Sequence, residues 1–195
     1  MRRTPEAARE NILAAAERLL LDHGPQALKL ADVASAAGVV HATVLHHFGS
    51  IADVQAALME RMIQQLVEQI LAAGGLEEDP AGRLEAGARA LFDAFESHGA
   101  ARLAAWLELT GEARRLTMVR AAVDEVIARR VARDGVPPEA AEDFVLVSVA
   151  LAMGVGLFGR SLAELMGKPP GRTRQLAVEM LRRQIGALPQ PGPGG

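Results

Sequence analysis

The chain has 195 residues, half of them apolar, and a formal net charge of −3 at pH 7. It contains no cysteine, which excludes disulfides, thiolate zinc sites and cysteine nucleophiles. Tyrosine is absent and no strand-like alternation is sustained, so the composition predicts an all-α protein of about nine helices. The first ten residues, MRRTPEAARE, become polar and acidic too early for a signal peptide, and we expect a cytoplasmic protein.

The first predicted helix begins at Thr4 and Pro5, a capping residue followed by proline. It ends at Gly24-Pro25. Residues 29–48 then read KLADVASAAGVVHATVLHHF. Apolar residues recur at helical spacing before Gly38, and Val44 and Phe48 share one face after it. Two short helices joined at a glycine form the helix-turn-helix pattern.

The segment from residue 9 to residue 54 also resembles the DNA-binding domain of the TetR (tetracycline-repressor-like) transcriptional regulators. The order and spacing of the matching residues fit without a gap. They are Ile12, Ala15, Ala16, Gly24, Asp32, Val33, Ala34, Ala37, Gly38, Val39, Thr43, His47, Phe48, Gly49 and Ser50.

The resemblance implies a homodimeric regulator that binds double-stranded operator DNA, by analogy a repressor released by a small molecule. We expect base contacts from His41, Ala42, Thr43 and His46 on the exposed side of the second helix. The other predicted DNA-binding residues are Lys29, Leu45 and His47.

Four positions depart from the family pattern. The family usually has Thr at Lys29, Ser at Val40, Tyr at Leu45 and Lys at Ile51, where relatives cap helices or touch phosphates. Losing a cap costs a helix about 1 kcal/mol, and phosphate contacts supply most non-specific affinity. The alternative function is therefore a small-molecule-binding or structural dimer of the same fold with weak or lost DNA binding.

A long helix is predicted from Ser50 to about Ala73, with apolar residues at every fourth position. Such a helix would join the two domains that we predict. Residues 6–66 form the helix-turn-helix domain, with its motif at 29–48, and residues 67–188 form a ligand-binding and dimerisation domain. The Pro- and Gly-rich end, 189–195, is predicted to be a disordered tail.

The second domain is predicted to contain helices that begin at Pro80, before Leu103, near Glu112, at Pro138 and at Arg172. Its middle helices carry most of the bulky side chains. These residues are either ordinary core or the wall of a pocket for an apolar effector. The candidate ligand-binding residues are Phe92, Phe95, Trp106 and Met118.

The last two helices are predicted to form the homodimer contact, as the family resemblance implies. Residues 154–159, GVGLFG, match the dinucleotide-binding spacing, but no further βαβ unit follows, so we interpret the glycines as close helix packing. The uncharged run from 144 to 159 is 16 residues, shorter than the roughly 20 needed to span a membrane. The predicted interface residues are Ala152, Gly156, Gly159, Ala177, Leu181 and Ile185.

Three histidines, His41, His46 and His47, do not have the spacing of three or four that metal ligands on one helix face require. We predict no metal and no cofactor. We interpret His47 as packed and the other two as outward-facing, either in plain solvent or donating to phosphate oxygens. An enzyme is the least supported class, because no acid–histidine constellation is visible.

Overall fold

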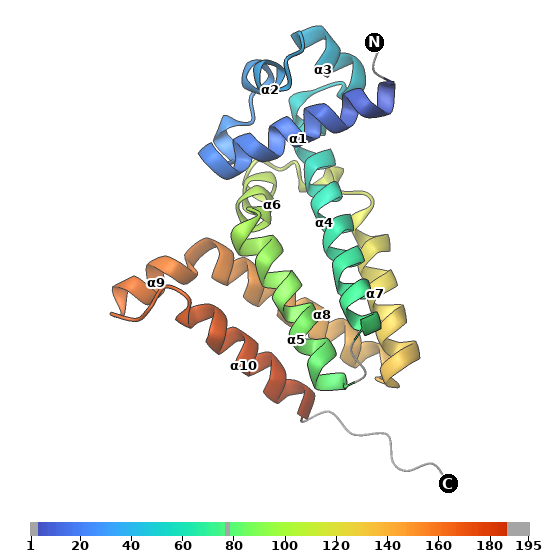
Figure 1. Ribbon diagram of the computed structural model, residues 1–195, viewed down its shortest axis with the longest axis vertical. Coiled ribbons are helices and arrows are strands. Elements are labelled where there is room, and N and C mark those ends of the chain that lie inside the picture. The colour runs from blue at the N-terminus through green and yellow to red at the C-terminus, as the bar shows by residue number, and fades with distance from the viewer. Residues whose placement is uncertain (1–3, 77–78, 187–195) are drawn as a thin grey trace. The chain divides into compact units, whose positions relative to one another are not determined.

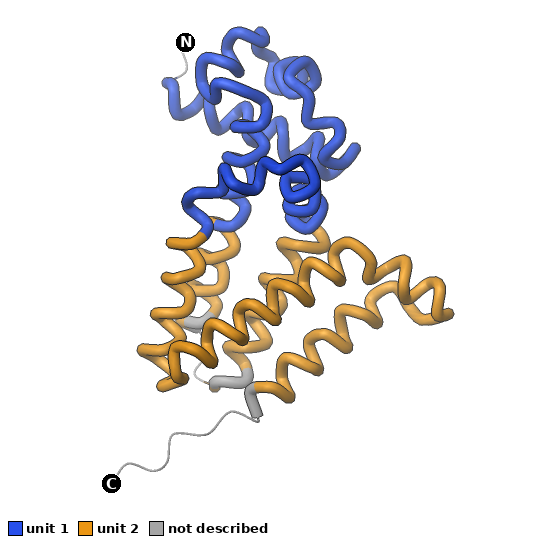
Figure 2. The backbone as a smooth tube through the Cα atoms, turned by 180° about the vertical axis from the view of Figure 1, so that it is seen from behind, with its two compact units in different colours: residues 1–63, 98–119 blue, residues 64–97, 120–195 orange. Residues whose placement is uncertain are grey.

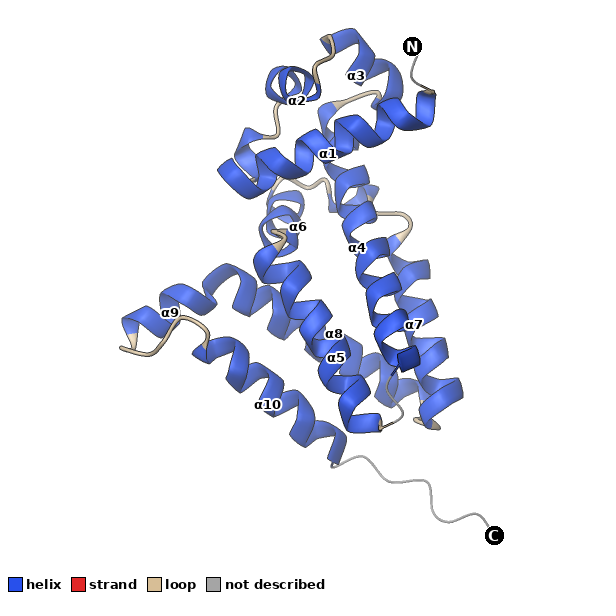
Figure 3. Cartoon of the chain, viewed as in Figure 1, coloured by secondary structure: helices blue, strands red, loops and turns tan. Residues whose placement is uncertain are grey.

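The computed structural model describes residues 4–76 and 79–186, and every regular element in these ranges is helical (Figure 1; Figure 3). The all-α prediction is confirmed. The helix α8, the π-helical turn η4 and the helix α9 follow one another without a break, which leaves nine helical rods in the described part. The predicted tail at 189–195 lies outside the described residues. The helices are α1 (Pro5–His23), α2 (Leu30–Ala37), α3 (His41–Phe48), α4 (Ile51–Leu76), α5 (Pro80–Phe92), α6 (Ala100–Leu109), α7 (Val119–Asp134), α8 (Pro138–Gly154), α9 (Arg160–Leu165) and α10 (Arg172–Gly186).

Four short turns separate or interrupt these helices. Two are 3₁₀ turns, η1 (Pro25–Ala27) and η3 (Ala113–Arg115), and two are π-helical, η2 (Asp93–Ser97) and η4 (Val155–Gly159). The helix predicted to begin near Glu112 in fact begins at Val119. The chain leaves the helical conformation at Leu116, which has ψ 73°.

The chain forms two compact units (Figure 2). Unit 1 contains residues 1–63 and 98–119, and unit 2 contains residues 64–97 and 120–195. The helix α4 contributes its first half to unit 1 and its second half to unit 2. The units interleave along the chain, because α6 and η3 belong to unit 1. The functional boundary at residue 66 stays a prediction.

Unit 1 has a core of aliphatic side chains and one aromatic ring. Side chains from α1, α2, α3, α4 and α6 are buried in it, as the apolar spacing of residues 12–20 and 54–62 predicts. Thr4 accepts a hydrogen bond from the Ala7 amide, which confirms the predicted cap of α1. The core residues at or near zero exposure are Ile12, Ala15, Ala16, Leu20, Val33, Ala34, Val44, Val54, Leu58, Leu103 and Leu107.

Unit 2 packs α5, α8 and α10 around the two π-helical turns, which contact each other. The Thr173 hydroxyl donates to the Gly159 carbonyl at 2.8 Å, so α10 is fastened to η4. Arg174 forms an ion pair with Asp93 of η2 at 2.8 Å. Consecutive residues of α10 therefore hold the two π-helical turns.

One helix in the described part, Pro138–Leu165, is long and apolar enough to cross a membrane, with a mean hydropathy of 1.8. Of its most apolar stretch, 22% is buried inside the protein. The same helix carries the exposed Arg160–Glu164 ion pair, at 2.9 Å. Most of the apolar surface of this helix is therefore exposed in the single chain.

Candidate nucleic-acid interface

The helices α2 and α3 meet at a tight turn that only glycine adopts readily. Gly38 has φ 67° and ψ 36°, the left-handed conformation, and its amide donates to the carbonyls of Ala34 and Ser35 at the end of α2. Gly49 closes α3 with φ 86°. The predicted helix, glycine turn and second helix are therefore present at the predicted residues.

Three side chains of α1 hold the C-terminal ends of these two helices. Asn11 donates to the Ala37 carbonyl at 2.8 Å and Arg9 to the His47 carbonyl at 2.6 Å. Arg18 donates to the last turn of α2. Cations beside helix C-termini also complement the helix dipole. These contacts fix the orientation of α3.

Arg9 also lies over the Phe48 ring, with its guanidinium carbon 4.1 Å from the ring centroid. Asn11 and Arg18 were not among the residues predicted to support the motif. Asn11 and Arg18 are seven residues apart, which places both side chains on one face of α1. This spacing could have indicated that they contact the same neighbouring helix.

The side of α3 opposite its buried residues is open to solvent. Val44 and Phe48 point into the core, at 0% and 9% exposure. Of the predicted DNA-binding residues, five are exposed and two, Thr43 and His47, are half-buried. The exposed residues are Lys29, His41, Ala42, Leu45 and His46.

Neither α2 nor α3 has a side-chain cap. Lys29 and Val40 stand at the two N-cap positions, and neither side chain bonds to the helix that follows. Val40 is 69% exposed. By contrast, Ser50, which precedes α4, accepts from the Asp53 amide at 3.1 Å.

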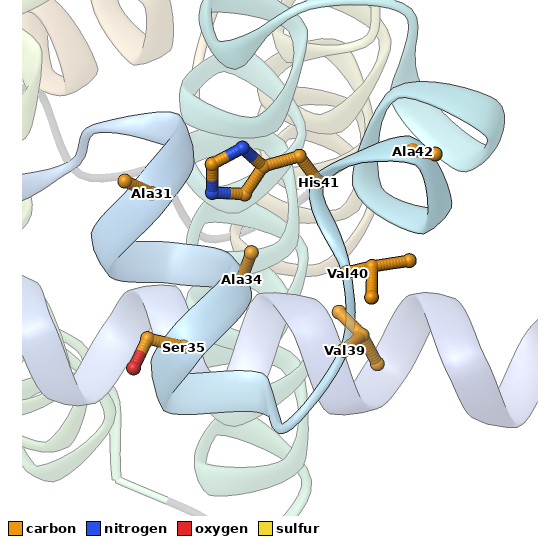
Figure 4. Close-up of a pocket in the computed structure, with 7 residues that line it drawn as sticks. All are labelled: Ala31, Ala34, Ser35, Val39, Val40, His41 and Ala42. Carbon is orange, nitrogen blue, oxygen red and sulfur yellow. The ribbon is translucent and has the colours of Figure 1, made fainter.

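An open groove of about 540 Å³ lies between α2 and α3 (Figure 4). The imidazole of His41 extends from the start of α3 back toward Ala31 and Ala34 of α2, whereas Val40 and Ala42 extend away from α2. We call this feature the α2–α3 groove. It is lined by Ala31, Ala34, Ser35, Val39, Val40, His41 and Ala42.

The cations of unit 1 fall into two groups. Arg61 and Arg115 are neutralised by carboxylates of the same unit. Arg9, Arg18 and Lys29, around α2 and α3, form no ion pair with a described carboxylate, and neither do Arg102 of α6 and Arg114 of η3. Three of these five cations therefore lie beside the helix-turn-helix motif, where they add positive potential for an anionic partner.

A charged network fastens η3 to the beginning of α4. Arg115 pairs with Asp53 at 2.7 Å and also with Glu112. The Asp53 carboxylate accepts a hydrogen bond from Ser50 at 2.6 Å. The hydrogen bond and charge of Glu112, with the charge of Asp53, raise the pKa of the Arg115 guanidinium above its ordinary value. Arg115 therefore stays charged, and the network links Ser50, which precedes α4, to η3.

The four candidate ligand-binding residues lie in different units. Phe92 and Phe95 are buried in unit 2, while Trp106 is half-buried and Met118 is 63% exposed in unit 1. Among the described residues, no group of three or more histidine, aspartate or glutamate side chains is placed to hold a metal.

The predicted interface residues on the last helices lie mostly inside unit 2. Ala152, Gly159, Ala177 and Leu181 are buried there, and Gly156 is partly exposed. The side chain of Ile185 lies outside what the structure describes. The exposed apolar residues on the same helices are Leu146, Val147, Phe158, Leu162, Leu165, Leu176 and Met180.

Residues 12–58 match the model of the bacterial regulatory proteins of the tetR family. The HTH-type transcriptional regulator BetI of Rhizobium meliloti (strain 1021) is 31% identical over 112 residues, which are 57% of this chain and 55% of that protein. The chain thus matches about half the length of this curated relative.

Solved structures share the fold over nearly the whole chain. A TetR-family transcriptional regulator from Streptomyces coelicolor has a TM-score of 0.67 at 18% identity, covering 93% of this chain and 99% of that one. The multidrug binding protein EbrR, complexed with imidazole, has a TM-score of 0.66 at 22% identity, covering 94% and 96%. A putative transcriptional regulator from Rhodococcus sp. RHA1 has a TM-score of 0.69 at 16% identity, covering 93% and 96%.

Proposed function

We propose that this chain, whose N-terminal residues 12–58 are a tetR-family domain, is a cytoplasmic DNA-binding transcriptional regulator. The observation that carries the proposal is the orientation of α3. Val44 and Phe48 anchor the helix in the core, while His41, Ala42 and His46 remain exposed. The major groove of B-DNA is about 12 Å wide and admits one such helix.

A gel-shift titration with the DNA upstream of the gene, over a series of salt concentrations, tests this function. Ala42→Glu should abolish the shift, because it places a carboxylate in the first turn of α3, where it faces DNA. Glutamate is favourable in the first turn of a helix, so the fold should survive. Leu109→Glu is the matched control, since Leu109 is 86% exposed on α6 of the same unit. Equal binding by both variants would contradict the proposed interface.

The protein acts as a homodimer through its last two helical rods. Phe158, Leu162, Leu176 and Met180 are between 43% and 59% exposed, and such an apolar face in a soluble protein marks an interface. Of the residues first predicted for this contact, Ala152, Gly159, Ala177 and Leu181 are buried within the single chain and Gly156 is partly exposed. A twofold dimer presents two α3 helices to DNA about 34 Å apart, or a multiple of that distance.

Sedimentation equilibrium in detergent-free buffer tests the dimer. Phe158→Glu and Met180→Glu should shift the protein toward the monomer, whereas Leu109→Glu should not. Flotation of the wild-type protein with phospholipid vesicles, and no dimer without them, would instead assign the apolar face to a membrane.

The regulator is a repressor that a small apolar effector releases from DNA. The support is a structural neighbour described as a multidrug binding protein, complexed with imidazole or with ethidium. Within unit 2, the buried rings of Phe92 and Phe95 are the aromatic side chains that we propose for contact with the effector. Trp106 is the only tryptophan in the chain, so a change in its fluorescence can be assigned to one site in unit 1. Ethidium, the compound in one neighbouring structure, is a first probe of binding to the DNA-free protein only, because it is a cation that also intercalates in DNA. An uncharged aromatic compound that binds the protein without releasing it from DNA would contradict the repressor mechanism.

The alternative is a ligand-binding or structural dimer that has lost DNA binding. Val40 and Leu45, both exposed, favour it, because neither supplies a hydroxyl where family members usually have one. Ile51 likewise lacks the usual lysine charge. Absence of a gel shift at low salt, with effector binding intact, would establish this alternative. We propose no catalytic activity in either case.

A further inference from the structure

The helix-turn-helix lacks the side chains that proteins most often use to read bases. Bidentate contacts come from arginine or lysine to guanine and from asparagine or glutamine to adenine. Residues 30–48 contain none of these four residue types. Asn11, Arg9 and Arg18 are occupied with the carbonyl groups at the ends of α2 and α3. A protein that recognises a DNA sequence with this surface must therefore use other chemistry.

The exposed chemistry of this surface is methyl groups and imidazoles. Ala31, Val40 and Ala42 are exposed members of the α2–α3 groove, and His41 lies between them (Figure 4). An apolar side chain at an N-cap position leaves α3 without a cap, which costs about 1 kcal/mol. The exposed Val40 is thus unfavourable for the free protein.

We propose that the α2–α3 groove, with Val40 and Ala42 at its rim, reads thymine in operator DNA through the C5-methyl group. Thymine is the one standard base that carries a methyl group on its major-groove edge, and apolar side chains recognise it there. The proposal rests on the proposed function and names the bases that α3 reads.

The charges around the groove favour DNA as its occupant over an apolar protein segment. Lys29 stands at the start of α2, and His41 and His46 lie on the exposed side of α3. None of the three forms an ion pair with a carboxylate of residues 4–76 or 79–186. An apolar strip bordered by unpaired basic groups complements a base edge bordered by phosphates.

The expected preference for thymine over uracil follows from the burial of one methyl group. Burying one methyl group changes the affinity of the protein for DNA about fourfold. Two symmetry-related thymines in a dimer site would together contribute about fifteenfold. Phosphate contacts do not distinguish thymine from uracil, so non-specific affinity should not change.

The experiment begins with selection of a duplex from a random pool by the purified full chain. Each thymine of the selected site is then replaced by deoxyuridine, one symmetric pair at a time, and affinity is measured by fluorescence anisotropy at one salt concentration. We expect a loss of about fifteenfold at one or two pairs and none elsewhere. Specific binding that is insensitive to every replacement overturns the inference. A selection that yields no sequence, with no binding at low salt, overturns the proposed function instead.

Two variants at one position assign the contact to Val40. Val40→Thr keeps one methyl group and Val40→Ser keeps none, and both supply the hydroxyl that can cap α3. Both should melt at a higher temperature than the wild type, so loss of the fold does not confuse the result. Val40→Thr should keep the preference for thymine over uracil, and Val40→Ser should lose it at one pair. A Val40→Ser protein with the wild-type preference overturns the assignment.

Discussion

The ion pairs of Arg61 should contribute to stability in proportion to their burial. Arg61 of α4 bonds to two carboxylates of α1, Glu10 at 2.6 Å and Glu17 at 2.5 Å, and to the Leu13 carbonyl at 3.3 Å. The Arg61 side chain is 13% exposed, that of Glu17 29% and that of Glu10 65%. Exposed ion pairs contribute about 0.2–1 kcal/mol, while hydrogen bonds between charged groups that are mostly buried contribute about 1.5–3.

We therefore expect Glu10→Ala to lower the free energy of unfolding by at most about 0.5 kcal/mol and Glu17→Ala by about 1.5. Both replacements make the same change of helix propensity within α1, so each is the control for the other. Arg61→Met removes both pairs and should cost about 2–3 kcal/mol.

Urea unfolding followed by Trp106 fluorescence measures these differences in unit 1, because that unit contains Trp106. High salt should remove the effect of Glu10→Ala and leave most of the effect of Glu17→Ala, since buried pairs are screened less. Equal costs for the two glutamate variants would refute the reasoning from burial.

Three further predictions concern other parts of the chain. Arg130 lies 4.0 Å from the Phe144 ring centroid, and burial lowers the pKa of its guanidinium, an effect that Asp134 partly offsets. Because the folded protein thus disfavours the charged form, Arg130→Met should change stability by less than about 1 kcal/mol in thermal melts; a larger loss would contradict this. Gly154→Ala should stabilise α8 by up to about 1 kcal/mol, because a β-carbon there meets nothing within 4 Å, and an unchanged or lower melting temperature would contradict it. Replacing both His41 and His46 with alanine should weaken DNA binding, because their exposed imidazoles can donate hydrogen bonds to phosphate oxygens; an unchanged affinity by fluorescence anisotropy at fixed salt would exclude them from the contact.

The helix-turn-helix could be predicted residue by residue because its signals are local. Gly38 and Gly49 end their helices in the sequence as in the structure, and Val44 and Phe48 have the spacing of a buried face. The exposure of Ala42 follows from the same periodicity. Local signals of this kind depend on which residues favour a turn and on helical spacing, and both can be identified from a short stretch of sequence.

The surroundings of the motif depend on contacts between distant residues, and these could not be predicted. Arg61 reaches back 44 residues to Glu17, and Arg115 reaches back 62 to Asp53. No periodicity links such positions. The same applies to α10, where the predicted apolar stripe Ala177 and Leu181 is buried within unit 2 instead of facing outward.

In the dimer proposed above, the π-helical turn η4 would affect which copies of the chain can pair. An α-helix turns about 100° per residue, and a π turn accommodates one additional residue. The part of the rod after Gly159 is therefore rotated by about 100° relative to an uninterrupted α-helix, and Leu162 is carried with it. A paralogue that lacked this one residue would point its leucines in a different direction. The length of a single turn would then keep related regulators in one cell from forming mixed dimers.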